Sequence, residues 1–181
     1  KYRPNFDTSN ETVTMPVICA KISGVKDGNE SAYWSTVKTL VTPETILFRQ
    51  SQLPMYNRSS DIMAVAPMFF RNKKLMKNAI KEHKSYVIIA TVLNLPDNII
   101  QRIQSFDFTK KNPKLLYINT GETIMSLEES IVIAYLNLIG FDIVCFVPTG
   151  YQCVEKHFST NIMEEHQIGQ YMYNMTIPNL E

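Results

Sequence analysis

Two Thr-Gly pairs are the residues of this chain whose types and spacing best fit a binding site. Thr120-Gly121 follows the apolar run at 114–119, and Thr149-Gly150-Tyr151 follows the apolar run at 142–147. Threonine supplies a hydroxyl group, and glycine lets a ligand approach the backbone closely. With Asn119 beside the first pair, these loops suit a phosphate or a sugar-phosphate. Because threonine and glycine are also good turn residues, an ordinary structural role is the alternative.

Ser23 and Gly24 form a third turn of the same kind, after the apolar run at 13–22. If the three runs are parallel strands, their carboxyl ends share one edge, where ligands of open α/β sheets bind near the reversal of strand order. Helix N-termini gather at the same edge and attract anions. We therefore expect the three turns to bind a small anionic ligand, such as a nucleotide.

Motifs of more specific chemistry are absent from the sequence. It contains no G-x-G-x-x-G and no G-x-x-x-x-G-K-[ST], so neither a dinucleotide fingerprint nor a P-loop is supported. His83, His157 and His166 are far apart, and no Cys/His spacing resembles a zinc site. The sequence therefore predicts no metal site, leaves the catalytic residues and the cofactor unknown, and leaves open whether the chain is an enzyme.

The spacing of apolar residues predicts the strands and helices that must position these turns. Runs rich in β-branched or apolar residues predict strands, and apolar residues three and four apart predict helices. The predicted strands are 13–22, 45–48, 86–93, 114–119 and 142–147. The predicted helices are 31–41, 71–83, 97–106, 127–139 and a shorter one at 152–158, while 61–70 fits either type.

Ser126 and Glu129 have the spacing of a capping box at the start of the 127–139 helix, and Gly140 stands where that helix should end. Alternation of strands and helices indicates right-handed βαβ units. The predicted fold class is α/β: a three-layer sandwich with a mainly parallel, Rossmann-like sheet of about five strands. The predicted site requires the strands at 114–119 and 142–147 to be parallel neighbours.

Composition bounds the class of protein. The 181 residues include 18 basic and 17 acidic side chains, so nucleic-acid binding is not indicated, and no apolar run is long enough for a membrane span. The odd count of three cysteines favours reduced thiols and a cytoplasmic setting. We expect a flexible lead-in at 1–12 and a single domain at 13–181. A start without methionine suggests a fragment of a longer protein.

Three segments resemble the YceG-like proteins of bacteria: PVICAKISGV at 16–25, AYW at 32–34 and GFDIVCFVPTGYQCVE at 140–155. That family is described as a component of a biosynthetic module and is encoded beside TelA-type and TerD-type tellurite-resistance proteins. The resemblance implies a role in tellurite or envelope stress. It implies no reaction and supplies no functional residues.

Three functions follow as hypotheses. The leading one is a domain of a bacterial tellurite and envelope-stress resistance protein that binds a small anionic ligand. The second is a non-catalytic interaction domain that docks TelA-type or TerD-type partners. The third, one half of a glycosyltransferase-like enzyme, rests on fold analogy alone.

Overall fold

The fold was examined in a computed structural model, which describes residues 17–50, 84–107, 111–158 and 162–180. The predictions for 1–12, 61–70 and 71–83 lie outside the described residues. None of the described helices is long and apolar enough to cross a membrane.

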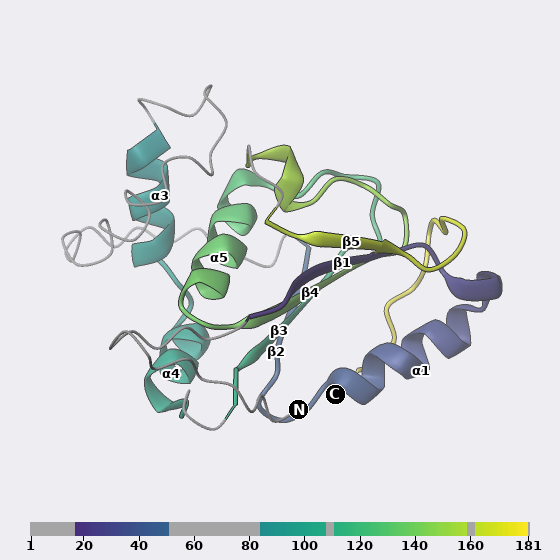
Figure 1. The fold of residues 1–181 in the computed structure, drawn as a ribbon, viewed down its shortest axis with the longest axis horizontal. Coiled ribbons are helices and arrows are strands. Elements are labelled where there is room, and N and C mark those ends of the chain that lie inside the picture. The colour runs from purple at the N-terminus through teal and green to yellow at the C-terminus, as the bar shows by residue number, and fades with distance from the viewer. Residues whose placement is uncertain (1–16, 51–83, 108–110, 159–161, 181) are drawn as a thin grey trace, which may run out of the picture.

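A parallel five-stranded sheet forms the centre of the fold (Figure 1). Its strand order is β2-β3-β4-β1-β5, and every neighbouring pair is parallel. The predicted α/β class with a parallel sheet is therefore confirmed. The strands are β1 Cys19–Ser23, β2 Ile46–Arg49, β3 Lys114–Ile118, β4 Asp142–Val147 and β5 Glu164–Gln167.

Helices cover both faces of this sheet (Figure 1). The helix α1, Glu30–Leu40, packs on one face, and α5, Leu127–Leu138, packs on the other. The α5 side also carries α3, Lys84–Leu93, which packs against α5, and α4, Asp97–Ser105. Two short 3₁₀ turns, η1 at Lys26–Gly28 and η4 at Val154–Lys156, follow β1 and β4.

Strand β4 shows why its sequence is almost continuously apolar. Ile143 and Cys145 belong to the core beneath α5, whereas Val144 and Phe146 belong to the core beneath α1. Alternate residues of a strand point to opposite faces, so a strand covered on both sides needs apolar residues at nearly every position. Its neighbour β3 is parallel, with Leu116 beside Val144, as the site prediction requires.

The start of α5 is fixed by the predicted capping box. The Ser126 hydroxyl oxygen accepts a hydrogen bond from the Glu129 backbone N–H at 3.1 Å, and the Glu129 carboxylate accepts one from the Ser126 N–H at 3.2 Å. These bonds satisfy donors that a helix start leaves free. After α5, Gly140 adopts a φ of 110°, so the predicted end is also correct.

The prediction of a strand at 86–93 was wrong, because this segment forms helix α3. Strand preference depends strongly on context, and tertiary packing decides such runs. Ile88, Val92 and Leu95 are four and three residues apart and pack into the core beneath α5. That helical stripe was present in the sequence but was outweighed by the β-branched residues.

Two further differences concern the region after β4 and the start of β1. The predicted helix at 152–158 is reduced to η4, and the described part of the first strand starts at Cys19.

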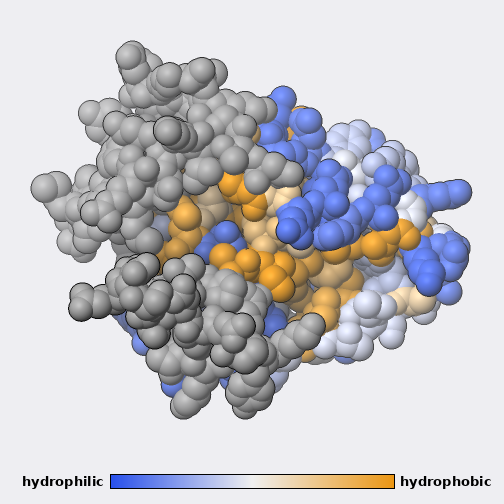
Figure 2. All heavy atoms as spheres, viewed as in Figure 1, coloured by the Kyte–Doolittle hydropathy of each residue, from blue (hydrophilic) through white to orange (hydrophobic). Residues whose placement is uncertain are grey.

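Strand β5 was missed because its sequence, EEHQ, has no apolar residue and all four residues are exposed. Figure 2 shows hydrophilic residues over β5 and a band of hydrophobic residues beside them.

A buried lysine holds β5 against the sheet. Lys21 on β1 is only 3% exposed, and its Nζ atom lies 2.7 Å from Glu155 Oε1 and 3.1 Å from Glu165 Oε1. Glu165 is the direct neighbour of Lys21 on β5, and Glu155 lies in η4. One buried ammonium group therefore ties β1, β5 and η4 together, and it fixes the register of the polar strand.

Two opposing effects act on the pKa of Lys21. Burial acts to lower it, while the hydrogen bond and charge of Glu155 and the hydrogen bond to Glu165 act to raise it, and the net shift is upward from 10.5. A lysine whose folded pKa is raised stabilises the fold fully below its unfolded pKa. That stability is lost as the pH rises through the folded value.

We predict that Lys21→Met lowers the free energy of unfolding at pH 7 by about 1.5–3 kcal/mol, the range for a hydrogen bond to a charged group. The difference from wild type should be constant between pH 7 and 9 and should shrink above the ordinary lysine pKa of 10.5. Urea unfolding at several pH values measures it. The exposed Lys26 supplies the control, Lys26→Met, which should change stability by less than about 0.5 kcal/mol. Equal effects of the two substitutions would contradict the assigned role.

Candidate functional site at the carboxyl edge of the sheet

The two Thr-Gly turns lie together at the carboxyl edge of β3 and β4. The Thr149 hydroxyl donates to the Gly121 carbonyl oxygen at 3.3 Å, and the Asn119 N–H donates to the Phe146 carbonyl at 3.0 Å. The first contact joins the loop after β3 to the loop after β4, and the second joins the loop after β3 to β4 itself. The structure therefore brings the two predicted turns to one rim.

Asn119 and Thr149 hold these loops in shape from inside. Asn119 is fully buried; its Oδ1 accepts from the Gly121 N–H at 2.9 Å, and its amide group donates to the Thr123 carbonyl at 3.0 Å. Thr149 is 2% exposed and uses its hydroxyl within the rim. Such local bonds are typical of Asn in turns, so these two side chains support the loop structure.

A tail, residues 168–180, covers the part of the edge formed by β1 and β4. Backbone hydrogen bonds run from Ile168 N to Ser23 O at 2.9 Å, from Val25 N to Gln170 O at 2.8 Å and from Met172 N to Pro148 O at 3.0 Å. Farther along, Met175 and Leu180 are buried against the α1 face. The tail is therefore part of the packed structure at this edge.

Gly24 and Gly150 make room for this tail. A Cβ atom on Gly24 would lie 2.3 Å from the Gly169 carbonyl oxygen, and one on Gly150 would lie 2.5 Å from Cε1 of Tyr171. Both glycines also have positive φ angles, +72° and +73°, which side-chain-bearing residues rarely adopt. The two glycines do allow a close approach to the backbone, as predicted, but the group that approaches them is the tail of the chain.

The tail lies at the point where the strand order reverses. The connection after β1 leads to α1 on one face, and the connection after β4 leads to η4 on the α5 side. In open α/β sheets, the crevice between two such strands is the usual ligand site. Beneath this crevice, the Ser23 hydroxyl is buried without a hydrogen-bond partner among the described residues.

The rim over β3 and the start of the next loop remains accessible. Thr120, Gly121 and Tyr151 are half-buried, and Glu122 is exposed. Within the described residues, no group hydrogen-bonds to the Thr120 or Tyr151 hydroxyl. Of the predicted site residues, Thr120 and Tyr151 therefore keep hydroxyls for a ligand, whereas the others support the loops or lie under the tail.

Two cysteines and a tyrosine of the sheet have raised pKa values, which keep them in their neutral forms at neutral pH. Burial, with the nearby Cys153, raises the pKa of Cys19 to about 12. The pKa of Cys145 is also raised, by its hydrogen bond with Cys153 and by burial. Burial and the charge of Glu129 raise the pKa of Tyr117, whose hydroxyl lies 3.4 Å from the Glu129 carboxylate. None of these groups is poised as a nucleophile at neutral pH.

The three cysteines are all free thiols. Across the described residues, no group of three or more His, Cys, Asp or Glu side chains could hold a metal ion. The site therefore consists of hydroxyls, loop backbone and an exposed carboxylate.

Comparison with known proteins supports the resemblance noted in the sequence. The sequence model of the YceG domain matches residues 1–88 and 84–176, which together span nearly the whole chain. The chain belongs to the YceG-domain family.

A curated relative is the "Uncharacterized protein YceG" of Bacillus subtilis (strain 168), 23% identical over 213 aligned positions. This alignment covers 94% of the chain and 39% of the relative, so the YceG domain described here spans well under half of that protein. No solved structure gives a significant match.

Sequence reasoning missed the role of the tail and of Glu155 and Glu165. The available signal was Lys21, a charged residue inside an apolar strand, which must find a carboxylate partner when buried. For the tail, the sequence offers no such signal. Gly169 stands among polar and aromatic residues, and nothing in the sequence shows that it packs on Gly24.

We predict that Gly24→Ala loosens the tail, whereas Gly28→Ala does not. Both glycines have positive φ angles, so both substitutions should cost about 1–2 kcal/mol of backbone strain. Only at Gly24 does the new Cβ meet a neighbour, because nothing lies within 4 Å of Gly28. Gly24→Ala should therefore cost at least about 1 kcal/mol more. It should also speed amide exchange at 168–175, measured by hydrogen–deuterium exchange. Unchanged exchange there would contradict the packing argument.

Proposed function

We propose that this YceG domain binds a small anionic ligand, a nucleotide or sugar-phosphate, at the open rim over β3 and β4. The observation that carries the proposal is the hydrogen bond between Thr149 and Gly121, which joins the two Thr-Gly turns at one edge. Thr120 and Tyr151 belong to these two loops and are half-buried, and their hydroxyls have no partner within the described residues. In a resistance protein of bacteria, such a domain would sense or hold a metabolite during tellurite or envelope stress.

The rim differs from a phosphate-binding helix start. The first turn of α5 is already occupied by the Ser126 hydroxyl and carries the acidic residues Glu128 and Glu129, which would repel an anion. The ligand would therefore be held by hydroxyl groups and by backbone N–H groups of the loops. Neutral hydrogen bonds of this kind contribute about 0.5–1.5 kcal/mol each, which favours a ligand of modest affinity.

Titration of the ¹⁵N-labelled chain with ATP, GTP, UDP-glucose and ribose 5-phosphate tests the proposal. We predict that one of these ligands shifts the amide resonances of Thr120, Gly121 and Tyr151. Thr120→Val and Tyr151→Phe should each weaken that binding about threefold to tenfold without changing the thermal midpoint, because neither hydroxyl has a hydrogen-bond partner in the part of the chain that the structure describes. If no compound of the panel shifts these resonances, the proposal is wrong.

Glu122 supplies a matched test of ligand charge. It is exposed beside Gly121, so Glu122→Gln should strengthen the binding of a phosphate and leave a neutral sugar unaffected. Lys26→Gln, far along the edge in η1, is the control and should change neither affinity. Equal or weaker binding of the phosphate by the Glu122 variant would contradict an anionic ligand at this rim.

A second function, docking of a protein partner, is favoured by the exposed apolar side chains near the same edge. Ile168, Tyr171 and Tyr173 of the tail are 42–47% exposed, as is Ile124 in the loop before α5 at 43%. Large exposed apolar groups that gather on a surface mark interaction sites. TelA-type and TerD-type proteins are the partners to test, by sedimentation with wild type and with a Tyr171→Ser/Tyr173→Ser variant.

A further inference from the structure

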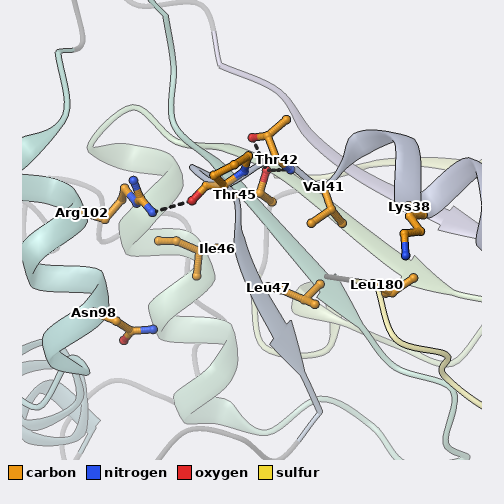
Figure 3. Close-up of a pocket in the computed structure, with 10 residues that line it drawn as sticks. Lys38, Val41, Thr42, Thr45, Ile46, Leu47, Asn98, Arg102 and Leu180 are labelled. Atoms are coloured by element: carbon orange, nitrogen blue, oxygen red, sulfur yellow. Dashed lines mark hydrogen bonds between the residues drawn. The ribbon is translucent and has the colours of Figure 1, made fainter.

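A pocket lies at the amino end of the sheet, opposite the carboxyl-edge rim and beside the edge strand β2 (Figure 3). Its volume is about 590 Å³, within the range of small-molecule sites. Helix α4 forms one side of the pocket, the end of α1 forms the other, and β2 runs between them. All of its lining residues belong to the described part of the chain.

The charged groups that line this pocket are cations, and no lining residue is acidic. Arg102 comes from α4 and Lys38 from α1, at opposite ends of the pocket in Figure 3. One guanidinium N–H of Arg102 donates to the Pro43 carbonyl at 3.0 Å, and the Lys38 ammonium group donates to the Asn179 carbonyl at 3.3 Å. Because Arg has five N–H donors and Lys has three, both keep donors for a ligand.

Asn98 adds a further donor on the Arg102 side. Its Oδ1 accepts a hydrogen bond from the Ile99 N–H at 3.0 Å, so its amide NH₂ group is the part left for a ligand. The hydroxyls of Thr42 and Thr45 hydrogen-bond to each other at 3.0 Å. The polar groups available in the pocket are therefore donors, which select a ligand that brings acceptors.

Apolar side chains line the pocket on both sides of β2, between the two cations. Ile46 and Leu47 project to opposite sides of β2, and Leu180 of the tail closes the α1 side (Figure 3). Ile46 and Leu180 are buried, at 6% and 2% exposed, and Leu47 is half-buried. A ligand that fits this lining combines a negatively charged head with an apolar body.

The surroundings strengthen this charge preference. Glu44 is the acidic residue adjacent to the pocket, and it is paired with Lys111. The hydrogen bond from Lys111, with the charges of Lys111, Arg102 and Lys114, lowers the pKa of Glu44. Glu44 thus already has a cation in Lys111, and the remaining donors of Arg102 and the charge of Lys38 are left for the ligand.

We propose that this pocket binds an amphipathic organic anion, a carboxylate or phosphate monoester on an aliphatic body. The acid group lies between Arg102 and Asn98, because a guanidinium group pairs with two oxygens of a carboxylate or phosphate at once. The aliphatic body passes around the edge strand β2, along Ile46 on one side and Leu47 on the other, and Lys38 adds positive charge at the far end. The site is independent of the carboxyl-edge rim, since it lies at the other end of the strands.

Methyl and amide resonances of the labelled 181-residue chain, titrated with matched eight-carbon probes, test the proposal. Octanoate and octyl phosphate are the two anionic heads, and octanol and octyltrimethylammonium are the neutral and cationic controls. We expect the anions to shift the methyl resonances of Ile46, Leu47 and Leu180 and to bind at least about tenfold more tightly than both controls. The tighter of the two anions identifies the head group. Acetate and inorganic phosphate, which lack the apolar body, should bind more weakly than either.

Variants of the two cations complete the experiment. Arg102→Gln should weaken octanoate or octyl phosphate about tenfold, Arg102→Lys should restore only part of the loss, and Lys38→Gln should have a smaller effect. Lys26→Gln, in η1 just before the start of α1, is the matched control and should bind as wild type does. Because Lys38 is exposed, Lys38→Gln should leave the chain folded, and it therefore still tests the proposal if Arg102→Gln unfolds. Equal binding of the anionic and neutral probes, or shifts confined to other residues, would overturn the proposal.

Discussion

The arrangement of this domain depends on one buried ammonium group. Lys21 stands in the middle of an apolar strand with almost no contact with water, and an unpaired charge there would be very unfavourable. Two carboxylates, from η4 and from an otherwise wholly polar edge strand, meet that requirement. The polar strand β5 has no apolar side chains to hold it, so its position in the sheet rests on its backbone pairing with β1 and on this ion pair. Because the tail begins directly after β5, the covering of the carboxyl edge depends on the same pair.

Much of the central sheet could be predicted from the sequence. Strand β4 coincides with the predicted range, and α1, α5 and the capping box at Ser126 were found with small shifts at their ends. These elements have either a continuous apolar run or a clear helical period, and both follow directly from burial on two faces or on one. The parallel pairing of β3 and β4 followed from the helix between them. This parallel pairing places Thr120-Gly121 and Thr149-Gly150 at one edge of the sheet, as expected.

The remainder could not be read because it depends on contacts between distant residues. The segment at 86–93 carries both strand-forming residues and a helical stripe, and only the core beneath α5 decides between them. The tail leaves no periodic pattern in the sequence because it is held by backbone hydrogen bonds, by the space above Gly24 and Gly150, and by two widely spaced buried residues, Met175 and Leu180. For the same reason, the sequence could not show that part of the predicted site is covered. The pocket beside β2 could not be predicted either, because its lining comes from the end of α1, from β2, from α4 and from the tail, which are far apart in the sequence.

The single tryptophan of the chain is connected to the tail through one carboxylate. The Trp34 indole N–H donates to Glu30 Oε1 at 3.2 Å, and the same oxygen accepts from the Thr176 backbone N–H at 3.2 Å. Trp34 is 6% exposed and packs edge-to-face on Tyr33, with ring centroids 5.1 Å apart. Tryptophan fluorescence, excited selectively so that the nine tyrosines do not contribute, is therefore an optical signal from the α1 face alone. Its intensity should report whether the segment around Thr176 is docked, without any added label.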